Sequence, residues 1–384
     1  MYSEKLCFKN GKFKIMQIAD VQDIFPVSED SIKLITLATE KEKPDLVVFT
    51  GDQIYGLDPR VRIGGAEKNA KKIIKAYLAP LEKNNIPFCV TFGNHDNQCG
   101  VSNARQAVFY GNSPFFVKGN RRSDDDPGTT VISLYGTDSG NRVFDLVLFD
   151  SGGQKPTGEY LPVTPGQLEW YKDTVYDDFA SGKSYPHIVF QHIPVPEFYD
   201  VIKKVPRSEK NAVEAFRTHK NEFYVLPDEI KNAGGFMHES PAVPDENSGE
   251  FDTLKNSGAC LAVIVGHDHI NSFVADKDNI KLIYTQCAGF NVYGPKRKRG
   301  VRVIELSEND PNSFTTYTVT FDELCSDRLK HPVQEFVLTH IPTSMEQVKR
   351  IATVTGAAVA VLSGTAFAAI KIVGAKRKSE KKFQ

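Results

Sequence analysis

The chain has 384 residues, of which 40% are hydrophobic and 25% are charged, and its formal net charge is −1. This balance is that of an ordinary globular protein, so it excludes wholesale disorder, a collagen-like chain and a protein with many membrane spans. The charge is uneven, because residues 346–384 carry a net +6 and the remainder therefore carries −7. An acidic body does not favour a nucleic-acid-binding protein.

The first quarter of the chain alternates short apolar runs with helical patterns. The runs Phe13–Ile18, Leu46–Thr50 and Phe88–Phe92 predict strands, and the second is apolar almost throughout, as in a strand buried on both faces. One helix is expected near Ser31–Lys41, and apolar residues at helical spacing predict another over Ala70–Leu81. This order predicts a largely parallel sheet covered by helices.

The rest of the chain adds one helix and several strands. The helix is predicted from Thr164 to Phe179, with Pro165 in its first turn. Residues 97–145 and 198–258 look like insertions, because the first stretch is polar and Gly-rich and the second is charged and contains several prolines. The remaining strands are expected at Leu146–Asp150, His187–Gln191, Leu261–Val265, Leu282–Gln286, Val301–Leu306 and Phe314–Phe321.

The cysteines and the N-terminus bear on the cellular compartment. The six cysteines are scattered and form no C-x-x-C pair, so they predict neither a zinc knuckle nor a dense disulfide framework, and one disulfide is left open. The first residues contain no apolar core of a signal peptide, and no Asn lies in a glycosylation sequon. Both absences favour a location outside the secretory lumen.

Polar side chains cluster where the predicted strands stop. In open α/β sheets, the carboxyl ends of the strands form the ligand site, so these side chains are expected on one rim. Carboxylate, amide and imidazole groups without a thiolate suit two hard-to-borderline cations such as iron, manganese or zinc. The clusters are Asp20, Gly51-Asp52, Gly93-Asn94-His95-Asp96, His192 and Gly266-His267-Asp268-His269.

This ordered set resembles the calcineurin-like metallophosphoesterases, whose pattern is D-x-H, G-D, G-N-H-[DE], H and G-H-x-H and covers roughly residues 12–306 here. The resemblance implies a four-layer α/β/β/α sandwich with a binuclear metal centre. It further implies that a metal-bound hydroxide hydrolyses phosphomonoesters. A phosphodiesterase on the same centre, or a catalytically inactive scaffold that binds protein partners, is the alternative.

One position departs from the family pattern. The first block reads D-V-Q, so that Gln22 stands where the family usually has His. One interpretation is a dead first site. The other rests on residues 51–55 and 189–192, which read G-D-Q-I-Y and V-F-Q-H and resemble the purple acid phosphatases. In that branch a Tyr phenolate replaces the missing His, so the resemblance implies Tyr55 as a ligand.

Carried over residue by residue, the resemblance implies two ligand sets that share Asp52 and hold two metal ions. The first set is Asp20, Asp52, Tyr55 and His269, and the second set is Asp52, Asn94, His192 and His267. A phenolate favours Fe(III) in the first set, with Fe, Zn or Mn(II) in the second. His95 is expected to face the substrate and to protonate the leaving alkoxide or stabilise its charge. Asp96 is expected to orient His95.

A basic run, Lys296, Arg297, Lys298 and Arg299, follows residues 289–293, just beyond the strands of the predicted site. Long-range attraction of phosphate is one interpretation of this run. A solvated basic turn is the preferred one.

The C-terminal segment 346–384 is expected to be separate from a catalytic domain at 1–345. Its 20 residues from Ile351 to Ile370 carry no charge, which predicts a marginal membrane-spanning helix over 351–373, with an ordinary helix as the alternative. The basic residues that follow favour a cytosolic C-terminus. The final K-K-F-Q resembles the dilysine signal of endoplasmic-reticulum membrane proteins. The side of the membrane on which the catalytic domain lies is left open, because the missing signal peptide argues for the cytosol.

Overall fold

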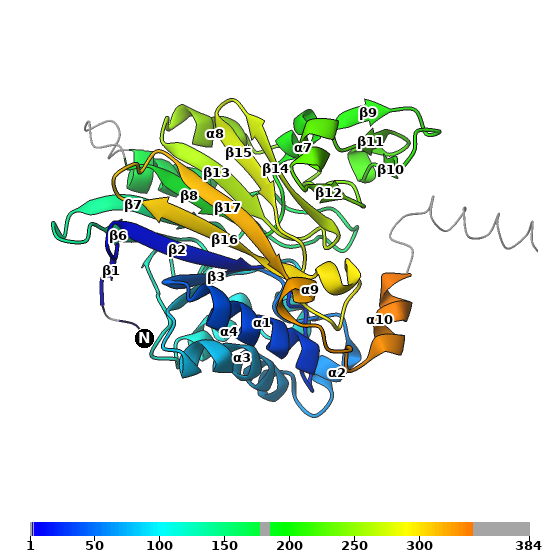
Figure 1. Ribbon diagram of the computed structural model, residues 1–384, viewed down its shortest axis with the longest axis horizontal. Coiled ribbons are helices and arrows are strands. Elements are labelled where there is room, and N and C mark those ends of the chain that lie inside the picture. The colour runs from blue at the N-terminus through cyan, green and yellow to red at the C-terminus, as the bar shows by residue number, and fades with distance from the viewer. Residues whose placement is uncertain (1, 3, 177–184, 341–384) are drawn as a thin grey trace, which may run out of the picture. The chain divides into compact units, whose positions relative to one another are not determined.

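The computed structural model describes residues 2, 4–176 and 185–340, which are built around two large β-sheets (Figure 1). The five-stranded sheet has the strand order β17-β16-β2-β3-β4. The nine-stranded sheet has the order β1-β6-β7-β8-β13-β15-β14-β12, with β5 paired to β6. A small third sheet, β10-β11-β9, lies within the second predicted insertion.

The five-stranded sheet carries the first motifs. Its strands β2 (Lys12–Ile18), β3 (Leu46–Thr50) and β4 (Phe88–Thr91) run parallel to one another. Strands β16 (Gly300–Ser307) and β17 (Phe314–Thr320) are antiparallel additions at the edge next to β2. The sequence therefore predicted every strand of this sheet, and the bounds of β3 match the prediction.

The nine-stranded sheet carries the later motifs. Its central strands β7, β8, β13 and β15 are parallel, so their carboxyl ends point the same way. The strands of this sheet and of the small sheet are β1 (Leu6–Cys7), β5 (Asn120–Arg121), β6 (Thr130–Tyr135), β7 (Arg142–Leu148), β8 (His187–Phe190), β12 (Phe236–Met237), β13 (Cys260–Val265), β14 (Asn271–Lys277), β15 (Ile280–Tyr284), β9 (Lys203–Val205), β10 (Val213–Glu214) and β11 (Phe223–Val225).

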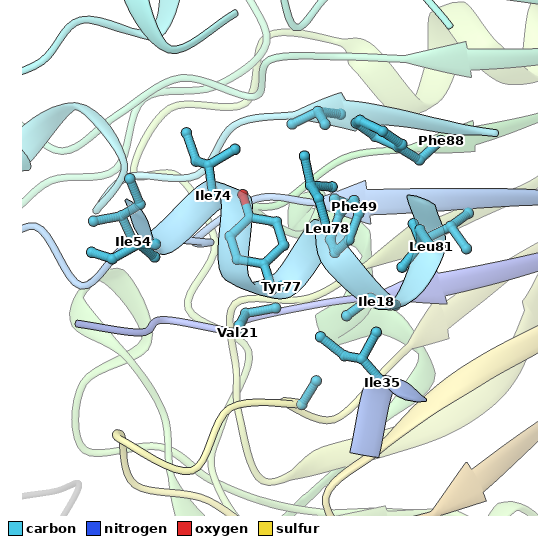
Figure 2. Close-up of a cluster of buried hydrophobic side chains, with 14 of the residues drawn as sticks. Ile18, Val21, Ile35, Phe49, Ile54, Ile74, Tyr77, Leu78, Leu81 and Phe88 are labelled. Atoms are coloured by element: carbon cyan, nitrogen blue, oxygen red, sulfur yellow. The ribbon is translucent and has the colours of Figure 1, made fainter. Parts of the chain in front are cut away.

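Helices α1 (Glu29–Glu42) and α3 (Ala66–Lys83) cover the outer face of the five-stranded sheet (Figure 1). Ser28 caps α1 by accepting a hydrogen bond from the backbone N–H of Ser31 at 3.3 Å. The buried face of α3 includes Tyr77, whose ring centroid lies 5.2 Å from that of Phe49 on β3 (Figure 2). This contact fixes the helix over the strand that ends at the second motif.

The other helical elements are shorter. The α-helices are α2 (Pro59–Arg62), α4 (Asn103–Tyr110), α5 (Pro165–Tyr171), α7 (Asp228–Asn232), α8 (Glu250–Asn256), α9 (Phe321–Leu324) and α10 (Pro332–Thr339). Single turns of other helix types are η1 (Asn97–Cys99), η2 (Lys172–Tyr176), η3 (Pro196–Val201), η4 (Arg217–His219) and η5 (Lys296–Lys298).

The side chains of the strands alternate between two cores, which produces four layers. On β2, Phe13 and Ile15 belong to the core between the two sheets, whereas Met16 and Ile18 belong to the core under α1 and α3. A third core on the far face of the nine-stranded sheet includes Leu168 of α5. The order is helix, sheet, sheet, helix, so the described residues have the mixed α/β fold that was predicted.

Two predicted features differ from the structure. Residues 97–145 are not only a surface insertion, because β6 and part of β7 within them pair inside the nine-stranded sheet. Polar turns flank β6, so the sequence pattern did not predict a strand there. The α-helix predicted over 164–179 ends as α5 at Tyr171 and continues as the π-helical turn η2. Residues 177–179 lie outside the described part of the chain.

Several expectations concern cysteines and membranes. All six cysteines are free, so the structure contains no disulfide among them. Within residues 2, 4–176 and 185–340, no helix combines the length and the apolar composition that crossing a bilayer requires. The predicted span 351–373 lies outside these residues. The chain divides into one unit ending at His340 and a second comprising residues 341–384.

Candidate metal centre

The backbone at the strand ends is unusual for non-glycine residues. Asp20, Gln22, Asp52 and His267 have φ angles of 52°, 35°, 52° and 74°. Such left-handed conformations cost about 1–3 kcal/mol unless the surrounding structure enforces them, and they cluster at functional sites. The strand-to-loop transitions after β2, β3 and β13 therefore turn sharply where the predicted ligands stand.

Glycines beside the ligands leave no room for a side chain. A Cβ atom on Gly93 would overlap the carboxylate of Asp52, and one on Gly266 would come within 2.5 Å of Asp20 Oδ2. Close packing against the carboxylate of another motif therefore explains Gly93 and Gly266, whereas a Cβ on Gly51 would lie 2.7 Å from the backbone nitrogen of Gly93 and from His192. The motifs fit together as one site, although they come from strands of two different sheets.

Four donor atoms of the second ligand set converge on one point. His192 Nε2 lies 3.1 Å from Asn94 Oδ1, 3.3 Å from Asp52 Oδ2 and 3.1 Å from His267 Nδ1. His192 Nδ1 lies 3.0 Å from the carbonyl oxygen of Thr50, to which it donates its proton. This hydrogen bond leaves the lone pair of Nε2 directed at the other donors, which is how a second partner orients a ligating histidine.

The first ligand set is looser. His269 Nε2 lies 3.6 Å from Asp20 Oδ1, and His269 Nδ1 lies 2.9 Å from the carbonyl oxygen of Tyr293. Gln22 is buried in the same place, and its Nε2 donates a hydrogen bond of 2.6 Å to Asp52 Oδ2. The amide of Gln22 therefore contacts the shared carboxylate from the position at which the family pattern has His.

The ring of Tyr55 lies next to the site, beside that of His95. Its centroid lies 5.7 Å from that of His95, with the two rings edge to face, and the side chain packs against the core under α1 and α3. The contact that the structure shows is thus with His95. The role of Tyr55 as a ligand stays a prediction.

His95 is the predicted catalytic residue and lies at the mouth of the site. Its side chain is 19% exposed, whereas that of Asp52 is 1% exposed. Its Nε2 lies 4.0 Å from Asp52 Oδ2, and its backbone N–H donates to Asp52 Oδ1 at 2.8 Å. The imidazole of His95 thus has access to solvent, and through it to a substrate, on one side.

Asp96 was predicted to orient His95, but its carboxylate has other partners. Its carboxylate accepts hydrogen bonds from the backbone N–H groups of Asp52, Gln53, Ile54 and Gly93 at 2.8–3.0 Å, so it holds the loop that carries Asp52. His95 Nδ1 instead lies 2.6 Å from Oε1 of Gln98. Gln98 was missed, although its position three residues after His95 in a tight turn is the signal that would have found it.

Burial and neighbouring charges set the protonation of the predicted ligands. Burial raises the pKa of Asp20, whereas Asp52 titrates low because the pull of His192 and His95 outweighs its burial. Burial also lowers the pKa of His269 to about 3, and burial together with His192 lowers that of His267, so both imidazoles are neutral at pH 7. Asp52, His267 and His269 are therefore in the forms that bind metal, whereas Asp20 and His192 would each release a proton when an ion binds, because the pKa of Asp20 is raised and that of His192 is raised to about 10.

These donors fit a metal ion. Asp52, His192 and His267 each offer a ligand atom, and these atoms lie within 4.8 Å of one another in a fully buried cluster. Nδ2 of Asn94 is buried and has no hydrogen-bond partner in the described structure. An oxygen and imidazole set of this kind suits iron, manganese or zinc. Asp20 and His269 are the residues that would hold the ion of the first ligand set together with Asp52.

Comparisons with known proteins agree with this geometry. Residues 13–271 match the family model described as calcineurin-like phosphoesterase, so the chain belongs to this family. The match confirms the predicted resemblance. It covers all five motifs and ends at residue 271, shortly after the last of them.

The chain is also similar to individual proteins. It is 27% identical over 348 residues to the Arabidopsis thaliana protein named probable inactive purple acid phosphatase 29, and the match covers 78% of each chain. It is 25% identical over 340 residues to Phosphatase DCR2 of Saccharomyces cerevisiae, covering 79% of this chain and 53% of that protein. These names confirm the predicted purple-acid-phosphatase-like branch. Among solved structures, a dimetal phosphatase from Danio rerio aligns with 80% of this chain and 99% of its own at 15% identity and a TM-score of 0.48.

Proposed function

We propose that this chain is a binuclear metal-dependent phosphoesterase that hydrolyses phosphomonoesters. The observation that carries the proposal is the convergence of Asn94 Oδ1, Asp52 Oδ2 and His267 Nδ1 within 3.3 Å of His192 Nε2. Membership of the calcineurin-like phosphoesterase family supports the reaction class. The finer assignment to monoesters rests on the resemblance to purple acid phosphatases.

Some residues of the site would bind the metal ions, and others would transfer protons. The first ligand set, which contains Asp20 and His269, would hold one ion, and the second set, which contains Asn94 and His192, would hold the other. Asp52 belongs to both sets. Two bound ions supply Lewis acidity for the phosphoryl group and lower the pKa of a bound water. His95 is placed to give a proton to the leaving oxygen of the ester, and Gln98 fixes its Nδ1 at 2.6 Å.

An inactive scaffold is the second candidate. Gln22 in place of His favours it, and so does the word "inactive" in the name of the Arabidopsis relative. Against it stands the burial of Asp20 and Asp52, which are 0% and 1% exposed. Burying two carboxylates among several imidazoles costs desolvation energy, so a scaffold that binds no metal gains nothing from keeping them.

The proposed reaction is tested with p-nitrophenyl phosphate and bis(p-nitrophenyl) phosphate after the protein is loaded with iron, manganese or zinc. The monoester is expected to be cleaved faster. Asn94→Ala should release the ion of the second set and abolish turnover, whereas Asn84→Ala, at the remote end of α3, should change neither. Folded wild-type protein that retains no metal and cleaves neither ester would leave the scaffold as the function.

His95→Ala tests the proton transfer separately. It should keep both ions and lose roughly 10²–10⁴-fold in rate, the usual contribution of a general acid. The loss should be smaller for substrates with a good leaving group such as p-nitrophenolate than for alkyl phosphates. Loss of metal in this variant would make His95 a ligand rather than an acid.

Fe(III) in the first ligand set, with Tyr55 as its phenolate ligand, is the proposed metal identity. A ferric phenolate absorbs visible light, so iron-loaded protein should be coloured and Tyr55→Phe should bleach it. Tyr293→Phe is the matched control, because its ring stacks on His269 without being in the predicted ligand set. A spectrum that Tyr55→Phe leaves unchanged would return Tyr55 to the role of packing against His95.

Membrane attachment through 351–373 is a proposal from the sequence alone. Its support is the uncharged run from Ile351 to Ile370 followed by a basic cluster. Carbonate extraction of membranes tests it, because an integral protein stays in the pellet. Recovery of the full chain in the supernatant would end this proposal, and protease protection in sealed vesicles would show on which side the catalytic domain lies.

A further inference from the structure

Arg299 is the member of the predicted basic run that does not behave like a solvated residue. It lies between η5 and β16, and it is the largest fully buried side chain of the described chain, with 0% exposure. Lys296 and Lys298 in the same run are exposed, as expected. A buried guanidinium is retained only where charge and hydrogen bonds balance its removal from water, so its partners identify its role.

The partners of Arg299 are backbone and sulfur atoms of the loop next to the metal centre. Its Nη2 donates to the carbonyl oxygen of Val292 at 2.7 Å, and its Nη1 donates to that of Tyr293 at 3.3 Å and to Cys287 Sγ at 2.9 Å. The planar guanidinium reaches these three acceptors from a single position, which a lysine ammonium cannot do.

Two of these partners in turn hold His269. The carbonyl oxygen of Tyr293 accepts the Nδ1–H of His269 at 2.9 Å, and the Tyr293 ring stacks on the His269 ring at a centroid distance of 4.3 Å. The backbone N–H of Cys287 donates to the carbonyl oxygen of His269 at 3.1 Å. Arg299 therefore supports both the ring and the backbone of this predicted ligand through one intermediate residue each.

The charge of Arg299 is balanced by Glu335 on α10. Glu335 Oε2 lies 3.0 Å from Nη2 of Arg299, and Glu335 Oε1 accepts a hydrogen bond of 2.8 Å from Thr339 on the next turn. Glu335 is the one buried residue of α10, whereas Val333, Phe336 and Val337 are 76%, 64% and 56% exposed. This arrangement inverts the usual amphipathic pattern, so an ion pair rather than an apolar face attaches α10 to the domain.

We propose that Arg299 is a positioning residue for the metal ligand His269, and that α10 takes part in the support of the first ligand set through Glu335. The proposal rests on the proposed function, because it assigns to this support the retention of the ion held by Asp20 and His269.

A substitution at Gly294 is an independent way to disturb the contact between Arg299 and Cys287. A Cβ atom at this position would overlap Nη1 of Arg299 and would lie 2.6 Å from Cys287 Sγ, while the backbone angles of Gly294 do not demand a glycine. Gly294→Ala therefore displaces the guanidinium and removes neither its charge nor its partner on α10.

The experiment measures Mn²⁺ binding to the full-length chain by titration calorimetry and by electron paramagnetic resonance, which separates a coupled Mn²⁺ pair from a single ion. Arg299→Met and Gly294→Ala should weaken the first ion by roughly 10–100-fold, the usual effect of removing an outer partner of a ligand. Both should leave the second ion in place and give the single-ion spectrum, which is also the result expected for His269→Ala. Arg297→Met, two residues away and paired with Asp322 instead, is the matched control and should retain the pair.

Glu335 separates the contribution of α10 from that of Arg299. Glu335→Gln keeps the shape and one hydrogen bond, so it should weaken the first ion less than Arg299→Met does. The double variant Arg299→Met/Glu335→Met leaves no unpaired charge, and it should still lose the first ion if the contact with Tyr293 is what matters. Arg299→Lys should recover only part of the affinity.

The outcomes distinguish this inference from the proposed function. Wild-type protein that binds neither Mn²⁺ nor iron or zinc in the same measurement overturns both. Wild-type protein with two ions, together with folded Arg299→Met or Gly294→Ala protein that also holds two ions at wild-type affinity, overturns this inference alone. If Arg299→Met does not fold, Gly294→Ala and Glu335→Gln carry the test, and unchanged affinity in both of them rejects the proposal.

Discussion

His187 is the first residue of β8, and His192 lies two residues after the end of this strand. Both side chains are 0% exposed, yet their pKa values shift in opposite directions. Burial lowers the pKa of His187 to about 4, and its ring is held by the hydroxyl of Tyr171 at 2.8 Å. Burial acts on His192 in the same sense, but the carboxylates of Asp52 and Asp20 outweigh it and raise the pKa to about 10. Neighbouring carboxylates rather than depth therefore account for the difference between these two histidines.

The largest effect is expected from removing the carboxylate of Asp52, which raises the pKa of His192. Asp52→Asn should release both ions, because both ligand sets share this residue, and activity should fall by about 10³-fold, the scale of losing a major electrostatic contact. Asn keeps the shape of the side chain and tolerates a left-handed backbone. Metal analysis after dialysis and p-nitrophenyl phosphate turnover measure the result. Two retained ions would show that Asp52 is not the bridge.

The two histidines themselves form the next test. His192→Asn should lose the ion of the second set and about 10²-fold or more in activity, beyond the loss typical of an outer partner. His187→Asn should keep both ions and lower the free energy of unfolding by about 1–3 kcal/mol, because the hydroxyl of Tyr171 loses its partner. Metal content and urea unfolding separate the two effects. Equal metal loss in both variants would contradict the contrast drawn between them.

The pH dependence of stability sharpens the contrast further. The unfolded pKa of His187 is about 6.5 and its folded pKa is about 4, so the unfolded chain binds the extra proton between these values. The stability that neutral His187 contributes is present above pH 6.5 and is lost as the pH falls towards 4, amounting to about 2 kcal/mol by pH 5. Urea unfolding of metal-free protein from pH 7 to pH 5 should show this slope. His187→Gln should flatten it by that amount, and an equal slope in the variant would refute the assignment.

The smallest expected effect concerns Gln22, whose amide donates to Asp52 at 2.6 Å. Gln22→His would place an imidazole where the family pattern has one, and it should tighten the first ion by about tenfold, the lower end of effects near a metal. Calorimetric titration with Mn²⁺ measures this, with Gln17→His, on the buried strand β2, as a control that should not tighten binding. Weaker binding in Gln22→His would mean that the amide is itself required.

Much of the fold was predictable because the strands of the parallel sheet are apolar and short. Leu46–Thr50 is buried at every position, so its pattern has a single interpretation. The other sheet was harder to predict: β6 lies between polar turns in a Gly-rich stretch, so no strand was predicted there, although it pairs with β7, the next strand along the chain. Helix α5 continued as a π-helical turn after Tyr171, which no residue pattern announces.

The site was predictable as a set of residue types and less so as a set of contacts. Asn94, His192 and His267 come together as the motif order suggested, because each follows a strand whose end faces the same rim. The partner of His95 was not predicted, since Asp96 is engaged by backbone N–H groups of the loop around Asp52. The burial of Arg299 within a basic run was also beyond sequence reasoning, because it depends on Glu335 across 36 residues.

The left-handed backbone of Asp20, Asp52 and His267 has a consequence for mutational scanning. At such positions alanine is a poor reference residue, because it removes the ligand and also adds a conformational cost of about 1–2 kcal/mol. Glycine removes the ligand without that cost, so the difference between the Gly and Ala variants at one position reports the backbone contribution alone. A saturation library should therefore show Gly and Asn tolerated for folding at these three positions, even where every substitution abolishes turnover.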